Sequence, residues 1–117
     1  MLDIYEKTVE LLEKGEDFAI VTVIESDGST PRGIGTKMIV LKNRKTYGTI
    51  GGGCLESAAI EEGLIAIEEK KSKTVKYSLE EIDKGGIGMR CGGNIDLFIE
   101  SINPSHNINT RIRNDEI

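Results

Sequence analysis

The 117-residue sequence is poor in several residue types, and each shortage narrows what the protein can do. It has no tryptophan, three tyrosines and two phenylalanines, too few for the aromatic platforms on which nucleic-acid bases stack. Basic residues are also outnumbered, with 15 Lys and Arg against 20 Asp and Glu and a net charge of -5. Nucleic acids and anionic membranes require a basic face, so we expect neither as a partner.

Long hydrophobic runs and cysteines are equally scarce. No apolar run approaches the roughly 20 residues that cross a bilayer, and residues 1–6 lack the basic and apolar regions of a signal peptide. We therefore expect a cytoplasmic protein, in which thiols stay reduced. The only two cysteines, Cys54 and Cys91, are then better interpreted as ligands or nucleophiles than as a disulfide. Two cysteines cannot supply a four-ligand zinc or iron–sulfur site unless a second chain contributes, and the single histidine, His106, lies in the polar tail.

The length predicts one domain, and strand-like and helix-like segments alternate along it. We expect an α/β fold, a single small domain in which a mixed β-sheet is flanked by two main helices. Residues 1–102 would form this domain, and the polar residues 103–117 would be a tail or a linker stub. Hydrophobic patterns predict strands over residues 18–24, 37–42, 45–50, 74–77 and 95–100.

Two segments have helical periodicity. The first begins at Asp3, carries Tyr5, Val9 and Leu12 on one face, which we expect to pack on the core, and ends at Gly15. The second covers residues 54–71 and is the stronger prediction. Gly63 lies on its apolar stripe, where it would let the helix approach a strand closely, the alternative being a glycine that is merely tolerated.

Three glycines, Gly51, Gly52 and Gly53, precede Cys54. Glycine lets a ligand approach the main chain, at an entropic cost that a simple connection does not require. Cys54 stands at the start of the second predicted helix, where unpaired N–H groups and the helix dipole favour an anion such as a thiolate. Cys54 is thus a candidate nucleophile, sulfur carrier or soft-metal ligand. The alternative is a small buried residue in a crowded turn.

A second cysteine motif follows later in the chain. Cys91 lies between Arg90 and the pair Gly92-Gly93, so charge and bare backbone both favour its thiolate. If this loop meets the one before Cys54, the two sulfurs could bind one soft metal of the molybdenum or copper class. Otherwise residues 85–93 are only a flexible connection.

A third glycine loop combines hydroxyls, a cation and two glycines, which suits a phosphate or the side chain of a pterin. Its spacing matches neither the P-loop nor the dinucleotide fingerprint, so a rigid polar hairpin is the competing interpretation. The residues that we assign to the candidate site from this loop are Ser29, Thr30, Pro31, Arg32, Gly33 and Gly35.

Taken together, the three motifs resemble the N-terminal domain of the xanthine dehydrogenase accessory (XdhC-like) proteins. The resemblance rests on residues 28–38, 48–56 and 88–93 with Glu100, and covers about residues 9–100. It implies an accessory protein rather than an enzyme. Such proteins bind the molybdenum cofactor, protect it while a cysteine desulfurase supplies a sulfido ligand, and pass it to an apo-molybdenum hydroxylase such as xanthine dehydrogenase.

The resemblance also implies a cofactor pocket. Residues 29–35 and 51–54 would line it, residues 91–93 would close it, and Cys54 and Cys91 would be the candidate metal ligands. The cofactor would be molybdopterin or its dinucleotide form. Family members commonly continue into a Rossmann-like domain. Here either a separate chain would supply that domain, or this protein would perform only the cofactor-holding half. We also expect a homo-oligomer.

Two other functions stay open at this point. One is a dimer that shares Cys54 and Cys91 between chains around zinc or copper. The other is a small sulfur-transfer enzyme that uses the Cys54 thiolate.

Overall fold

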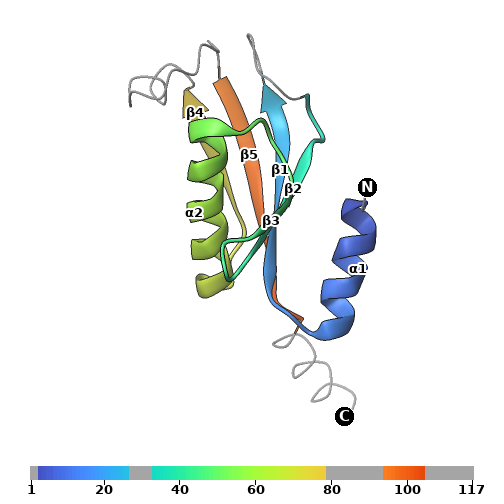
Figure 1. Ribbon diagram of the computed structural model, residues 1–117. Helices are drawn as coiled ribbons and strands as arrows, with labels where there is room; N and C mark the ends of the chain where they lie inside the picture. Colours follow the sequence, from blue (N-terminus) through green and yellow to red (C-terminus); the bar gives the residue numbers. More distant parts are fainter. Residues whose placement is uncertain (1–2, 27–32, 79–93, 105–117) are drawn as a thin grey trace, which may run out of the picture.

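The computed structural model of the protein describes residues 3–26, 33–78 and 94–104 (Figure 1). The described residues form two helices and a five-stranded sheet, which confirms the expected small α/β domain. In chain order the elements are α1 (Ile4–Lys14), β1 (Phe18–Ser26), β2 (Lys37–Leu41), β3 (Thr46–Gly48), α2 (Gly53–Glu69), β4 (Lys73–Ser78) and β5 (Asn94–Ile102). No helix in these ranges is long and apolar enough to cross a membrane.

The strands are ordered β3-β2-β1-β5-β4, with β1 at the centre. Phe18 of β1 pairs with Leu41 of β2 on one side and with Ile102 of β5 on the other. Every described pairing is antiparallel, where we expected a mixed sheet. Strands β3 and β4 do run in the same direction, as a helical crossover through α2 favours. However, β2, β1 and β5 lie between them, so no parallel neighbours result among the described strands.

Helix α2 covers one face of the sheet and forms the main core with it (Figure 1). Along β1 and β5, the buried side chains that face α2 alternate with side chains of the other sheet face. On β1 they are Ala19, Val21 and Val23, and on β5 they are Ile95, Leu97 and Ile99. A Cβ added at Gly63 would lie 3.1 Å from Cβ of Val40. The prediction that Gly63 lets the helix lie close to a strand is therefore confirmed.

Helix α1 begins and ends as predicted. The Asp3 carboxylate accepts a hydrogen bond from the Tyr5 N–H at 3.3 Å, and Gly15 ends the helix in the left-handed conformation, with φ of 69°. The face on which it packs was predicted wrongly, because Tyr5, Val9 and Leu12 are 65%, 53% and 42% exposed.

The packing face of α1 is instead formed by Ile4 and Leu11, which join a second cluster with Phe18 and Ile39. This cluster lies on the sheet face opposite α2, over β2 and β3. A short helix at the edge of a sheet contacts it along a narrow strip. Ile4 and Leu11, seven residues apart on one line of the helix, fill that strip. The apolar stripe at residues 5, 9 and 12 therefore stays outside.

Gly48 marks a close approach between β3, β2 and α1. Its φ is 78°, and an added Cβ would lie 2.8 Å from the Lys37 carbonyl oxygen and 2.9 Å from Cδ1 of Ile4. Backbone cannot move aside as a flexible side chain can. We expect Gly48→Ala to lower the free energy of unfolding by about 1–3 kcal/mol, measured by urea denaturation. Gly33→Ala, with ordinary φ and nothing within 4 Å, is the matched control, and an equal loss in both variants would contradict this account.

Tyr77 of β4 packs partly buried against the main core. Burial of the hydroxyl, and secondly the charge of Glu62, raise the pKa of Tyr77 above its usual value. The unfolded chain therefore ionises first, so stability should fall as pH rises from about 10 toward the folded-state pKa. We expect Tyr77→Phe to remove this part of the alkaline loss, measured as unfolding free energy against pH. Parallel pH profiles for Tyr77→Phe and the unchanged protein would contradict the prediction.

Candidate functional site at the N-terminus of helix α2

The glycine loop before α2 has a backbone that few other residues adopt. Gly51, Gly52 and Gly53 have φ of 131°, 78° and 64°, three successive residues in the region that disfavours side chains. A Cβ added at Gly52 would meet no atom within 4 Å. Glycine is thus required there by conformation rather than by crowding, and the main chain is left uncovered.

Two buried side chains hold this loop at its ends. Ile50 before it and Leu55 after it are both fully buried in the core that α2 forms with the sheet. The intervening residues 51–54 are more exposed than either anchor. The loop is therefore a turn whose two ends are fixed by buried side chains, and not an unconstrained connection.

The carboxylate of Glu56 stabilises the same loop through hydrogen bonds. Its Oε2 accepts a hydrogen bond from the Gly52 N–H at 2.8 Å and from the Thr49 hydroxyl at 2.5 Å. The Thr49 hydroxyl oxygen in turn accepts a hydrogen bond from the Gly51 N–H at 3.1 Å. We call this arrangement of Thr49, Gly51, Gly52 and Glu56 the loop clamp. Glu56 lies in the first turn of α2, where the helix dipole favours an acidic side chain.

Cys54 is the second residue of α2, as expected from the sequence, and it is partly exposed with a free thiol. The first N–H groups of a helix have no intrahelical acceptor. Among the described residues, the amides of Gly53, Cys54 and Leu55 have no acceptor. The thiol therefore lies next to three backbone donors that an anionic group can use.

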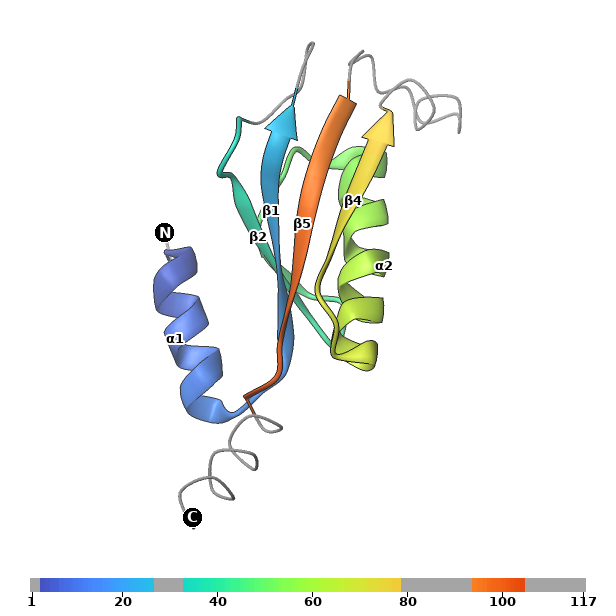
Figure 2. The same cartoon turned by 180° about the vertical axis from the view of Figure 1, so that it is seen from behind.

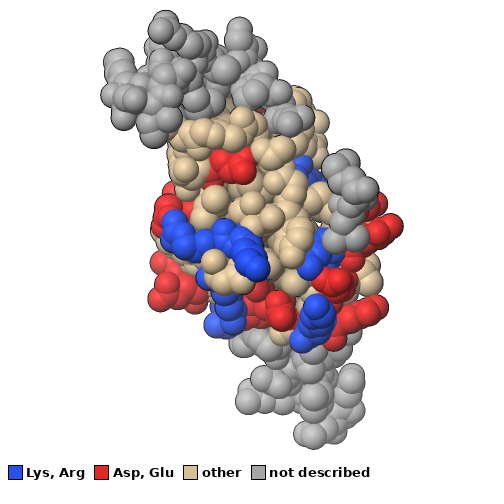
Figure 3. All heavy atoms as spheres, viewed as in Figure 1, with Lys and Arg blue, Asp and Glu red and all other residues tan. Residues whose placement is uncertain are grey.

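On the face seen in Figure 3, most of the described Lys, Arg, Asp and Glu side chains lie in the half remote from the start of α2. Among the described residues, the backbone dipoles of the helix start and the carboxylate of Glu56 act directly on this point.

Part of the predicted glycine loop of residues 29–35 lies at the same end of the sheet. The Gly35 N–H donates to the Val23 carbonyl at 2.7 Å, and the Thr36 hydroxyl donates to the Gly33 carbonyl at 2.7 Å. Because Met38 pairs with Gly48, this end of β2 is also the end from which β3 leads to α2. Gly33 and Gly35 are thus at the sheet end that carries Gly51–Cys54 (Figure 1).

The other predicted site residues lie outside the described ranges and stay predictions. They are Ser29, Thr30, Pro31, Arg32, Arg90, Cys91, Gly92 and Gly93. The described residues that flank them converge, since Ser78 pairs with Asn94 and Ser26 pairs with Ile95. The strand ends that flank these residues in the sequence therefore lie beside one another, at the end of the sheet where α2 begins (Figure 1).

A polar hollow of ≈ 500 Å³ at this end was not predicted from the sequence. Its lining comes from three strands and contains hydroxyl, amide and charged groups. The residues are Glu25, Ser26, Lys76, Tyr77, Ser78, Asn94 and Asp96. No local motif marks them, because β1, β4 and β5 become neighbours only when the sheet forms.

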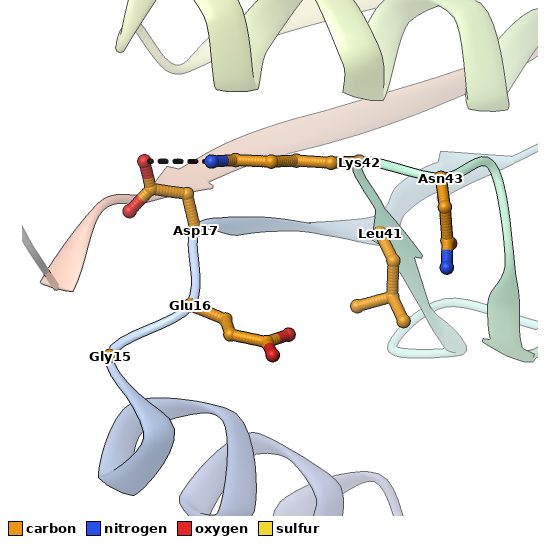
Figure 4. Close-up of a pocket in the computed structure, with 6 residues that line it drawn as sticks. All are labelled: Gly15, Glu16, Asp17, Leu41, Lys42 and Asn43. Atoms are coloured by element: carbon orange, nitrogen blue, oxygen red, sulfur yellow. Dashed lines mark ion pairs between the residues drawn. The ribbon is translucent and has the colours of Figure 1, made fainter.

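Two other hollows lie at the opposite end of the sheet and contain none of the predicted site residues. One of ≈ 390 Å³ lies between the end of α1 and β2, and is lined by Gly15, Glu16, Asp17, Leu41, Lys42 and Asn43 (Figure 4). In it Asp17 and Lys42 point toward each other and form an ion pair at 3.9 Å. The other, of ≈ 490 Å³, shares this pair with the last turns of α2. Neither has the nucleophile and backbone donors found around Cys54.

Within the described residues there is no cluster of three or more His, Cys, Asp or Glu side chains that could hold a metal ion. Any metal bound near Cys54 would need ligands from the undescribed loops, from a partner or from a cofactor.

The loop clamp generates a direct prediction. We expect Glu56→Ala to lower the free energy of unfolding by about 1–2 kcal/mol, because the Gly52 N–H and the Thr49 hydroxyl lose a charged acceptor. Amide hydrogen exchange at Gly52 should become faster. Glu61→Ala removes an exposed carboxylate of the same helix that pairs with Arg44, and is the control. Unchanged exchange at Gly52 in Glu56→Ala would show that the clamp does not hold the loop.

Comparison with known proteins gives related sequences of much greater length. The chain is 34% identical over 98 residues to the uncharacterized protein YqeB of Escherichia coli, covering 84% of this chain and 18% of that protein. It is 31% identical over 94 residues to the molybdenum cofactor insertion chaperone PaoD of Escherichia coli, covering 80% and 29%. A probable xanthine dehydrogenase subunit of Bacillus subtilis is 28% identical over 94 residues, covering 79% and 28%.

A solved structure agrees with these sequences. The crystal structure of a xanthine dehydrogenase from Bacillus halodurans matches with a TM-score of 0.69 and 29% identity, over 80% of this chain and 30% of that one. The chain thus spans less than a third of the length of each of these relatives. Residues 11–78, which contain β1, the glycine loop and α2, match the model of the XdhC and CoxI family. The protein belongs to the XdhC and CoxI family.

Proposed function

We propose that this protein is a maturation factor that binds the molybdenum cofactor at the N-terminus of α2 and assists its insertion into a molybdenum hydroxylase. The observation that carries the proposal is the partly exposed glycine turn with Cys54 and, among the described residues, three unpaired backbone donors beside it. Family membership and the name of the PaoD relative support the same role. The role is that of an accessory protein and not of a catalyst.

The residues present fit such a cofactor. Backbone N–H groups at a helix start suit the phosphate oxygens of a pterin cofactor, and the open main chain at Gly52 leaves room for a close approach. A thiolate at Cys54 suits a soft metal such as molybdenum. When bound, the cofactor would supply the redox metal of the client enzyme. The chain itself would orient it, shield it and release it.

Finer parts of the role are proposals of the same kind. Cys91, Arg90 and residues 29–32 would complete the pocket, and molybdopterin or its dinucleotide form would occupy it. A cysteine desulfurase would supply sulfur, and an apo-molybdenum hydroxylase would receive the cofactor. A separate Rossmann-like chain and a second copy of this chain would be the assembly partners. The reducing cytoplasm would keep the thiols available.

A cofactor-transfer assay tests the role of Cys54. Protein loaded with molybdopterin is passed over a desalting column, and the retained pterin is measured by fluorescence after oxidation. Loss of one charge-assisted contact of about 1.5–3 kcal/mol should weaken retention by about ten- to a hundredfold in Cys54→Ala. Activation of an apo-xanthine dehydrogenase by the loaded protein should fall in parallel.

Ser57→Ala, an exposed change one turn along α2, is the matched control and should retain cofactor like the unchanged protein. Circular dichroism and urea denaturation verify that both variants fold. Equal retention by Cys54→Ala and Ser57→Ala would remove Cys54 from the mechanism. A persulfide trapped on Cys54 after incubation with a cysteine desulfurase would instead favour direct sulfur transfer.

A further inference from the structure

The sheet face opposite α2 is only partly covered by the described residues. Helix α1 lies over β2 and β3, while the same face of β1, β5 and β4 carries no described helix (Figure 2). Some side chains that point to this face are large and apolar, whereas a fully solvated sheet face carries polar side chains. Ile24, at a bulge of β1, is 38% exposed, and Phe98 of β5 is half-buried.

The exposed stripe of α1 borders this uncovered face. Ile4 and Leu11 contact the sheet, and Lys7 lies over the ring of Tyr47 on the edge strand β3. At 100° per residue, Tyr5 and Leu12 lie on the other side of Leu11 from Lys7, so they occupy the flank of α1 that is turned away from the edge strand β3 and toward β1. Val9 is next to them and points further from the sheet.

Large apolar side chains are concentrated here. Six are exposed among the described residues: Tyr5, Val9, Leu12, Ile24, Ile34 and Ile65. The first three form the α1 stripe, and Ile24 lies on the uncovered sheet face. We name Tyr5, Val9, Leu12, Ile24 and Phe98 the open face. Grouped exposed apolar side chains of this kind mark interaction sites.

The charges around the open face are mostly negative. Glu6 and Glu13 border the α1 stripe, and Glu25 and Glu100 lie on β1 and β5. Within the described ranges, no Lys or Arg pairs with these four carboxylates. The lysines on this side of the sheet are engaged, since Lys37 donates to the Thr22 hydroxyl at 3.1 Å, Lys76 lies 3.8 Å from Asp96, and Lys7 pairs with Glu10 over the Tyr47 ring.

We infer that the open face is a docking surface for a protein partner that presents an apolar patch bordered by Lys and Arg. Apolar anchors would supply affinity, and the acidic border would select basic partners and repel acidic ones. A second copy of this chain would bring carboxylates against carboxylates, so it does not fit this surface. The inference stands independently of the cofactor role.

A pair of synthetic peptides tests the inference. Both are amphipathic helices with leucines on one face, flanked in one peptide by lysines and in its twin by glutamates. Chemical-shift changes of the protein's backbone amides on titration map where each peptide binds. We expect the lysine-flanked peptide to shift amides of α1, β1 and β5, and the glutamate-flanked twin to leave them unchanged.

Variants sharpen the test. Leu12→Glu should weaken binding of the lysine-flanked peptide by about tenfold. The control Ile65→Glu changes a residue of α2 that is equally exposed, at 41% against 42%, and should bind like the unchanged protein. Glu13→Lys reverses an exposed charge and leaves the apolar stripe intact. It should weaken binding of the lysine-flanked peptide and strengthen binding of the glutamate-flanked peptide.

Three results would overturn the inference. They are equal binding of both peptides, shifts confined to other faces, and amide shifts of the open face that depend on protein concentration without peptide. The last would show that a second copy occupies the surface.

Discussion

The close packing of α2 on the sheet is the constraint on which the rest of the structure depends. Gly63 lets the helix approach β2 so closely that an added Cβ would lie 3.1 Å from Val40. This contact sets the distance of the helix from the sheet and the direction of its axis. Leu55 and Ala59 pack against the sheet nearer the start of the helix. Because the axis is fixed, the N-terminus of α2 lies at the end of the sheet where β1 and β4 also finish (Figure 1).

The candidate site follows from that placement together with the loop clamp. Three glycines in the left-handed region would be a disordered turn on their own, since glycine loses the most conformational freedom on folding. Ile50, Leu55 and the Glu56 carboxylate hold them in one conformation. The backbone donors beside Cys54 are thereby fixed before any ligand arrives, and a preformed site costs less ordering on binding. Among the described residues, the opposite sheet face with its exposed α1 stripe takes no part in this site.

Local patterns predicted the elements well, and tertiary relations poorly. Helix α2 was expected over residues 54–71 and is observed at Gly53–Glu69, because capping and periodicity are properties of the segment itself. The α1 stripe was misassigned, since amphipathicity shows that a face is apolar but not what covers it. The antiparallel sheet order and the hollow lined by β1, β4 and β5 join residues far apart in sequence. No spacing along the chain marks such contacts.

The central claim is that this domain carries the molybdenum cofactor, and the most direct measurement is the molybdenum and pterin content per chain. The protein would be purified without oxygen from a host that makes the cofactor. Our account predicts near-stoichiometric amounts of both. Absence of both, even after free cofactor is added, would contradict the account and leave the family relationship as one of fold alone.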